Sequence, residues 1–152
     1  MRALALAFFL CSAPALAAPP VLIGGSVAQT GQLADLSREY VRGLELWQAD
    51  VNARGGLAGR SVELRLVDDA SGARRAAEIT SELIAEGRVE LLVGPFGSPA
   101  TLAAAVVADR EQRIMVNATG AAENVHKRAL RYVFQLLPPA SEQALPVVKL
   151  AH

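Results

Sequence analysis

One segment, residues 89–106, constrains the fold of this chain more than any other. It opens with an apolar run at 89–93, of the kind that forms a strand buried on both faces. Gly94-Pro95-Phe96-Gly97 cannot continue a strand, and Pro99 is typical of the first turn of a helix. The segment therefore predicts a strand, a tight turn and a helix in immediate succession, as in parallel α/β sheets.

Ser98 stands at the predicted start of this helix, where two roles are open to its hydroxyl. Serine is a favoured N-cap, so Ser98 can serve its own helix, with Pro99 as the first helical residue. Alternatively, the hydroxyl and the unpaired N–H groups of the helix start can receive a carboxylate or another anion. Ligands bind at the carboxyl ends of strands in open α/β sheets, so this turn is the predicted binding site.

The rest of the chain alternates between strand-like and helix-like patterns. Apolar runs predict further strands at 21–23, 61–67, 114–116 and 132–134, and helical periods lie at 40–51, 76–83 and 141–150. Gly24-Gly25 is expected to end or bend the first strand, and strict alternation places 61–67 at a sheet edge. The pattern predicts an α/β fold, with a parallel sheet that carries helices on both faces.

Three side chains have a structural and a functional interpretation. Trp47 shares an apolar helical stripe with Tyr40, and the stripe favours a core position over an aromatic platform for a ligand. Asp68 and Asp69 follow the strand at 61–67 and can hold a metal or act as acid and base. With no third oxygen ligand nearby, the sequence favours capping of the next helix.

The small residues of Asn117–Ala122 follow the predicted strand at 114–116. Short side chains at the carboxyl end of a strand would let backbone N–H and C=O groups approach a ligand closely. An ordinary connecting turn would have the same composition, so this segment alone leaves both interpretations open.

The first 17 residues have the composition of a cleavable secretory signal peptide. Arg2 precedes an apolar run at 3–10, and Ala15-Leu16-Ala17 fits a cleavage site. The run is too short for a transmembrane helix, and no later segment is long enough, so no membrane span is expected. Cys11, the single cysteine, lies within the signal, which leaves no thiol for disulfides or thiolate metal sites.

The charges are balanced, with 15 basic and 15 acidic side chains and no basic run. Nucleic acid is therefore not an expected partner. Neither a metal ion nor a cofactor is predicted for the chain.

The ordered set of motifs resembles a known family. Thr30-Gly31 follows the first strand, Asn52-x-x-Gly55-Gly56 closes the first helix, Asp68-Asp69 follows the second strand, and Val93-Gly94-Pro95-x-x-Ser98-x-x-Thr101 precedes the small-residue loop. Across 21–152 the chain is similar to the periplasmic substrate-binding proteins of branched-chain amino acid ABC importers. These are the leucine/isoleucine/valine-type members of the type I periplasmic binding proteins.

The resemblance implies a set of ligand-binding residues. Ser98 corresponds to a hydroxyl that donates to the ligand carboxylate, and Ala118 to a backbone contact with its head group. The family's threonine position falls on Gly120, so either Thr119 replaces that hydroxyl or it is absent. Leu36 aligns loosely with a position that faces the cleft.

The resemblance also implies two lobes around a cleft, of which this chain would contain the first. It implies a signal peptide at 1–17, an N-terminal ligand-binding lobe at 18–137, and an interlobe crossing with the start of a second lobe at 138–152. The lobe alone is expected to bind ligand weakly or not at all, since family members are more than twice as long. Leu145 and its apolar neighbours Val148 and Leu150 should be partly exposed.

The implied function is that of a periplasmic, non-enzymatic protein that captures a small molecule and delivers it to ABC permease subunits. A branched-chain amino acid, another amino acid, an amide or urea would fit the motifs. A ligand sensor for a signalling partner and a non-functional fragment are alternatives. An exported enzyme is disfavoured, because Ser98 lies outside a Gly-x-Ser-x-Gly elbow and His126 is not an evident base.

Overall fold

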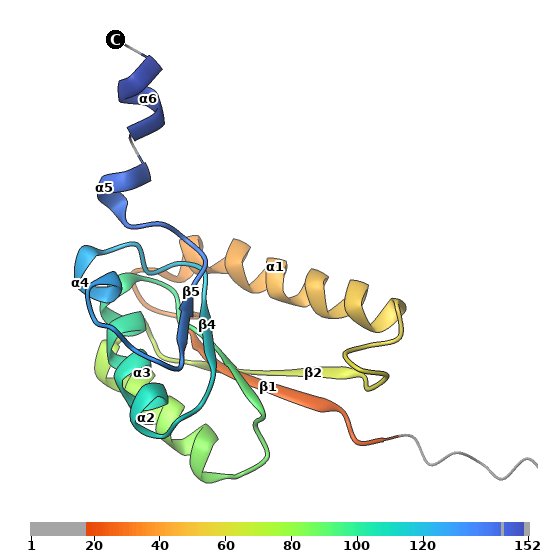
Figure 1. Cartoon of the computed structure of the whole chain (residues 1–152). Helices are drawn as coiled ribbons and strands as arrows, with labels where there is room; N and C mark the ends of the chain where they lie inside the picture. Colours follow the sequence, from red (N-terminus) through yellow and green to blue (C-terminus); the bar gives the residue numbers. More distant parts are fainter. Residues whose placement is uncertain (1–17, 144, 151–152) are drawn as a thin grey trace, which may run out of the picture.

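The computed structural model describes residues 18–143 and 145–150, so the predicted signal peptide lies outside the described residues. Five parallel strands form one sheet with the order β2-β1-β3-β4-β5 (Figure 1). The elements, in chain order, are β1 (Val21–Val27), α1 (Ala34–Ala53), β2 (Val62–Asp68), α2 (Ala73–Ala85), β3 (Leu91–Val93), α3 (Ser98–Arg110), β4 (Met115–Asn117), α4 (Glu123–His126), β5 (Val133–Gln135), α5 (Ala140–Gln143) and α6 (Leu145–Leu150).

The predicted parallel α/β sheet is confirmed, and β2 lies at its edge as its alternating sequence predicted. The expectation that Gly24-Gly25 ends the first strand is wrong, because β1 pairs with β2 through Val27. Gly25 instead permits close contact between β1 and β3, since a Cβ there would lie 2.6 Å from Val93 Cγ2. The glycine thus sets the spacing of two neighbouring strands.

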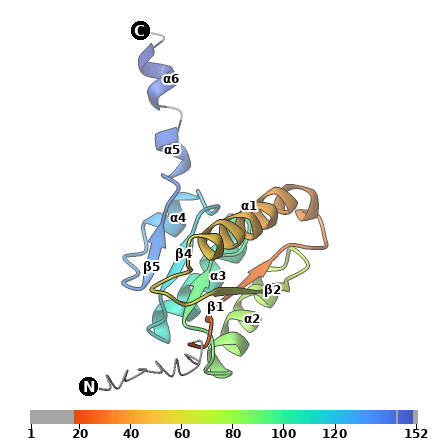
Figure 2. The same cartoon turned by 90° about the vertical axis from the view of Figure 1, so that its right-hand side faces the viewer.

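The two faces of the sheet are covered unequally (Figures 1 and 2). Helices α2 and α3 pack side by side on one face, while α1 lies across the other. The main apolar core lies between α2, α3 and the sheet, and consists of Ile79, Leu83, Val89, Leu92, Ala104, Ala105, Ala108 and Met115. A smaller cluster of Val21, Ile23, Val51 and Val62 lies under α1.

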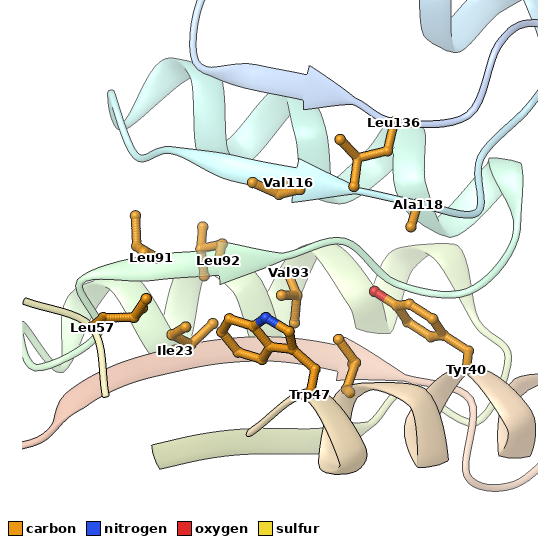
Figure 3. Close-up of a pocket in the computed structure, with 11 residues that line it drawn as sticks. Ile23, Tyr40, Trp47, Leu57, Leu91, Leu92, Val93, Val116, Ala118 and Leu136 are labelled. Carbon is orange, nitrogen blue, oxygen red and sulfur yellow. The ribbon is translucent and has the colours of Figure 1, made fainter. Parts of the chain in front are cut away.

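An apolar groove of about 340 Å³ runs beside α1 over β3 and β4 (Figure 3). Its lining residues are Ile23, Tyr40, Leu44, Trp47, Leu57, Leu91, Leu92, Val93, Val116, Ala118 and Leu136. The prediction that Trp47 is a core residue is therefore wrong: the residue is 37% exposed, whereas Val51 of the same stripe is 6% exposed. The stripe faces the sheet as predicted, but α1 alone does not cover this face.

We expect this groove to bind the aromatic rings of a fluorescent dye such as anilinonaphthalene sulfonate. Energy transfer from the indole of Trp47, the single tryptophan of the chain, reports that the dye is bound, and two variants locate it. Leu136→Ser should weaken dye binding about fivefold, since it removes about 1 kcal/mol of apolar contact. Leu46→Ser is the matched control, because Leu46 is equally exposed on α1 but does not line the groove. Equal affinities in the two variants would contradict the prediction.

The last two helices project away from the sheet (Figures 1 and 2). Leu145, Val148 and Leu150 are 47%, 51% and 88% exposed, which confirms their predicted partial exposure. No helix among residues 18–143 and 145–150 has the length and apolar character needed to cross a membrane.

Candidate functional site

The candidate site lies where the strand order of the sheet reverses. Chain connections run from β1 outward to β2 on one side, and from β3 to β4 and β5 on the other. The loops that follow β1 and β3 therefore separate above the sheet, and ligands of open α/β proteins bind at such switch points. The turn 94–97 and the start of α3 lie at this place.

Ser98 is the first residue of α3 rather than its N-cap, so the capping interpretation is wrong. Gly97 is the N-cap, and its φ of 88° lets the chain enter the helix directly from the turn. The Ser98 Oγ accepts a hydrogen bond from the Ala122 N–H at 3.2 Å, which ties α3 to the loop after β4. That bond uses an oxygen lone pair, and no group among residues 18–143 and 145–150 accepts the hydroxyl hydrogen, which can therefore be donated to a ligand.

The carbonyl groups of the turn are held by side-chain hydroxyls. Tyr40 donates to the Gly94 carbonyl at 2.8 Å, and Thr119 donates to the Pro95 carbonyl at 2.7 Å. The Thr101 hydroxyl also lies 3.2 Å from the Pro95 carbonyl. Burial raises the pKa of Tyr40 to about 12, so its phenol remains a neutral donor at physiological pH.

The loop after β4 brings three of the predicted site residues to the same edge. Ala118 is exposed and lines the end of the apolar groove, while Thr119 is half-buried (Figure 3). Gly120 is buried against α3, where an added Cβ would lie 2.7 Å from Thr101 Cγ2. A side chain at position 120 therefore has no room in this structure.

Leu36, the fifth predicted residue, lies in the first turns of α1 and is 65% exposed. It follows the loop after β1, so it belongs to the same edge of the sheet as Ser98. It lines none of the apolar groove.

Comparison with known proteins decides the family. A model of the periplasmic binding protein family matches residues 20–152. The chain belongs to this family. A Leu/Ile/Val-binding protein homolog of Brucella abortus is 32% identical, over 82% of this chain and 30% of its own length. An amino acid binding protein of Pseudomonas aeruginosa is 28% identical, over 82% of this chain and 33% of its own length.

Solved structures of periplasmic binding proteins agree with this assignment. The substrate-binding protein of a branched-chain amino acid transporter from Streptococcus pneumoniae, solved with isoleucine, is 27% identical with a TM-score of 0.74, over 79% of this chain and 34% of its own. A putative branched-chain amino acid ABC transporter protein from Rhodospirillum rubrum shares the fold, with a TM-score of 0.79 at 23% identity, over 87% of this chain and 38% of its own.

This periplasmic binding protein chain spans about a third of the length of its curated relatives, a span that fits one lobe. The resemblance to branched-chain amino acid binding proteins and the lobe-like α/β fold are thereby confirmed. The family is non-enzymatic, in agreement with the sequence prediction.

The sequence did not indicate Tyr40 as part of this site. Its place in the helical stripe predicts a side chain that faces the sheet, which is correct. The hydrogen bond from its hydroxyl to the Gly94 carbonyl, 54 residues away, has no signal in the sequence. The sequence places Asn117 in the small-residue loop, whereas it ends β4, is fully buried and joins Thr101 on α3 to Gln135 on β5.

The two neighbouring aspartates of the periplasmic binding protein lobe are loop-forming residues rather than helix caps. Asp68 accepts hydrogen bonds from the Gln29 and Thr30 backbone, the Thr30 hydroxyl and the Ala70 backbone. Asp69 accepts one from the Ser71 N–H, while α2 starts at the N-cap Gly72 without a side-chain cap. The capping prediction is therefore wrong. Within the described part of the chain, no group of three His, Cys, Asp or Glu residues could hold a metal ion.

The pKa values of these aspartates shift in opposite directions. Burial raises the pKa of Asp69, which is fully buried. Partial burial also raises the pKa of Asp68, but the hydrogen bonds from Thr30, Ala70 and Gln29 outweigh it and leave that pKa below its ordinary value. Asp68 therefore stabilises the fold above the pKa of the unfolded chain, and this stabilisation is lost as the pH falls through the folded value.

We expect Asp68→Ala to lower the free energy of unfolding by about 1–2 kcal/mol at neutral pH, because it removes three hydrogen bonds that join the loops after β1 and β2, and a fourth, from Ala70, within the second loop. The difference in free energy of unfolding between the variant and the unchanged chain should become smaller below about pH 4, where the Asp68 carboxyl of the unfolded chain is protonated. Urea unfolding across this range measures both effects. Asp35→Ala is the control, since Asp35 is exposed and forms one surface ion pair. A difference that does not vary with pH would contradict the prediction.

Proposed function

We propose that this chain is the ligand-binding lobe of an extracytoplasmic solute-binding component of an ABC importer. It would capture a branched-chain or related amino acid, or an amide, in a cleft between lobes and deliver it to permease subunits. The observation that carries the proposal is the start of α3, where Ser98 keeps a free hydroxyl hydrogen at the switch point of the sheet. Relatives named for binding leucine, isoleucine and valine support it.

The proposed contacts follow from this geometry. Ser98 would donate to the ligand carboxylate, assisted by the positive end of α3. Ala118 and Gly120 would offer backbone groups, and Leu36 would face the cleft from α1. Thr119 would contribute through the turn, because its hydroxyl hydrogen is already donated to Pro95. No cofactor or metal ion is required for capture.

The domain organisation belongs to the same proposal. A signal peptide at 1–17 would direct the chain to the periplasm, and 18–137 would form the lobe. Residues 138–152 would cross toward a second lobe. Pro138 and Pro139 support this boundary, since α5 and α6 project away from the sheet beyond them.

Titration with L-isoleucine, followed through the backbone amide signals in NMR spectra, tests the proposal. Saturable shifts are expected at the turn 94–97, at Ser98 and in the loop after β4. Ser98→Ala should weaken binding about tenfold or more, because a hydrogen bond to a charged group contributes about 1.5–3 kcal/mol. Ser61→Ala is the matched control, since Ser61 is exposed at the opposite end of the sheet, before β2. Unchanged affinity in Ser98→Ala, or no shifts at this edge, would refute the assigned site.

A further inference from the structure

Three hydroxyl groups converge on two consecutive carbonyl groups of the turn between β3 and α3. They come from separate parts of the chain: Tyr40 from α1, Thr101 from α3 and Thr119 from the loop after β4. Their oxygens lie 2.8 Å from the Gly94 carbonyl, and 3.2 and 2.7 Å from the Pro95 carbonyl, respectively. The turn is therefore fixed by contacts distant in sequence as well as by its own backbone.

Thr119 forms hydrogen bonds with two residues of this turn. Its hydroxyl donates to the Pro95 carbonyl and accepts a hydrogen bond from the Gly97 N–H at 3.3 Å. Gly97 is the N-cap of α3, and the next residue is Ser98. The orientation of the Gly97 peptide thus depends on Thr119, and it sets the direction in which α3 begins.

The hydrogen bonds also determine the charge that the turn presents. A hydroxyl has one hydrogen, and the Thr119 hydroxyl donates it to the Pro95 carbonyl. Thr119 therefore has no hydrogen left to donate to a ligand. The carbonyl oxygens that accept from Tyr40 and Thr119 carry partial negative charge, and these hydrogen bonds fix their orientation. If either rotated toward the mouth of the site, it would repel a carboxylate that the start of α3 would otherwise attract.

We propose that Thr119 and Tyr40 are positioning residues of the ligand site. They hold the turn so that Ser98 and the start of α3 receive a carboxylate, while neither contacts it. The effect on affinity rests on the proposed function, whereas the effect on the turn is measurable without a ligand. The phenol of Tyr40 is also the link between the apolar groove, which its ring lines, and this turn.

Three threonine variants of the full chain test the proposal. Thr119→Val keeps the shape of the side chain but removes both hydrogen bonds, and Thr119→Ser keeps the hydroxyl. Thr80→Val is the matched control, because Thr80 is buried in α2 and its hydroxyl also donates to a carbonyl, that of Ala76 at 2.7 Å. Two quantities are measured by NMR: the exchange rate of the Gly97 amide without ligand, and the affinity for L-isoleucine.

In Thr119→Val the Gly97 amide should exchange at least about tenfold faster, because its hydrogen bond to the Thr119 hydroxyl is lost. The affinity for L-isoleucine should fall about fivefold to tenfold, because the turn loses both hydrogen bonds to Thr119. Thr119→Ser should restore both quantities, and Thr80→Val should change neither. Tyr40→Phe keeps the ring and should lower the affinity for L-isoleucine about twofold to fivefold. This variant still tests the proposal if Thr119→Val does not fold.

An unchanged Gly97 exchange rate in Thr119→Val would overturn the positioning role, as would a loss of affinity in Thr119→Ser equal to that in Thr119→Val. If the unchanged chain gives no shifts with isoleucine, the proposed function fails instead. The Gly97 exchange rates then still decide whether Thr119 positions the turn.

Discussion

Replacing Gly120 with alanine is expected to lower the free energy of unfolding by about 2–4 kcal/mol. The added Cβ would lie 2.7 Å from Thr101 Cγ2 and 2.8 Å from its Cβ and Oγ1. Thr101 is fully buried, and its hydroxyl contacts the Pro95 carbonyl and Asn117 Oδ1, so it cannot turn aside without breaking those contacts. The substitution therefore forces α3 and the loop after β4 apart.

Urea unfolding measures this effect, and Gly43→Ala supplies the control. Gly43 lies inside α1, and an added Cβ would meet no atom within 4 Å outside the adjacent helix backbone, so alanine there should stabilise the chain by about 0.5–1 kcal/mol. The double variant Thr101→Ala with Gly120→Ala removes the clashing methyl and hydroxyl and leaves only the close contact with the Cβ of residue 101. It should be more stable than the sum of the single changes predicts, by about 1–2 kcal/mol. A fully stable Gly120→Ala would show that the loop can move away from α3 at little cost.

This steric conflict bears on the resemblance to the leucine/isoleucine/valine-binding family, whose threonine position falls on Gly120. In this structure Thr101 occupies the space that such a side chain would need. We therefore expect Gly120→Thr to destabilise the lobe rather than to add a hydroxyl to the site. The proposed direct donor from this side of the cleft is Ser98.

Elements whose burial follows from local patterns could be predicted from the sequence. The alternation at 61–67 gave both the strand β2 and its place at the edge, because one face of an edge strand meets solvent. The apolar run, turn and Pro99 likewise gave β3 and α3. In each case the pattern depends on residues close in sequence, and the structure uses them in the expected way.

Features that depend on distant neighbours could not be predicted. The period of α1 gives the face that Trp47 occupies, but whether a second helix covers that face depends on the rest of the fold. The carboxylate of Asp68 looks like a cap in sequence, yet it holds the Gln29–Thr30 loop 38 and 39 residues away. Serine favours the N-cap position, so the sequence predicts Ser98 there, but Gly97 takes that position with its positive φ and the helix starts at Ser98.

We expect the 152-residue chain to bind L-isoleucine only with a dissociation constant in the millimolar range. Small-molecule sites bury about 70–90% of the ligand surface, whereas the described residues form one wall, on which Ser98 is the proposed hydroxyl donor. Closure by an opposing lobe would supply the remaining contacts and exclude water. The binding free energies for millimolar and micromolar dissociation constants differ by about 4 kcal/mol, which we expect the contacts of the second wall to supply.

Calorimetry at micromolar protein should therefore show no heat of binding, while NMR titration up to tens of millimolar should show saturable shifts. The branched-chain amino acid transporter substrate-binding protein of Streptococcus pneumoniae is the positive control, since it was solved with isoleucine and this chain covers only 34% of it. Micromolar binding by this chain would mean that one wall suffices, and the apolar groove beside Ala118 would then be the place to look for the missing contact surface. Shifts that spread over the whole sheet without saturating would mean that the start of α3 does not select the ligand.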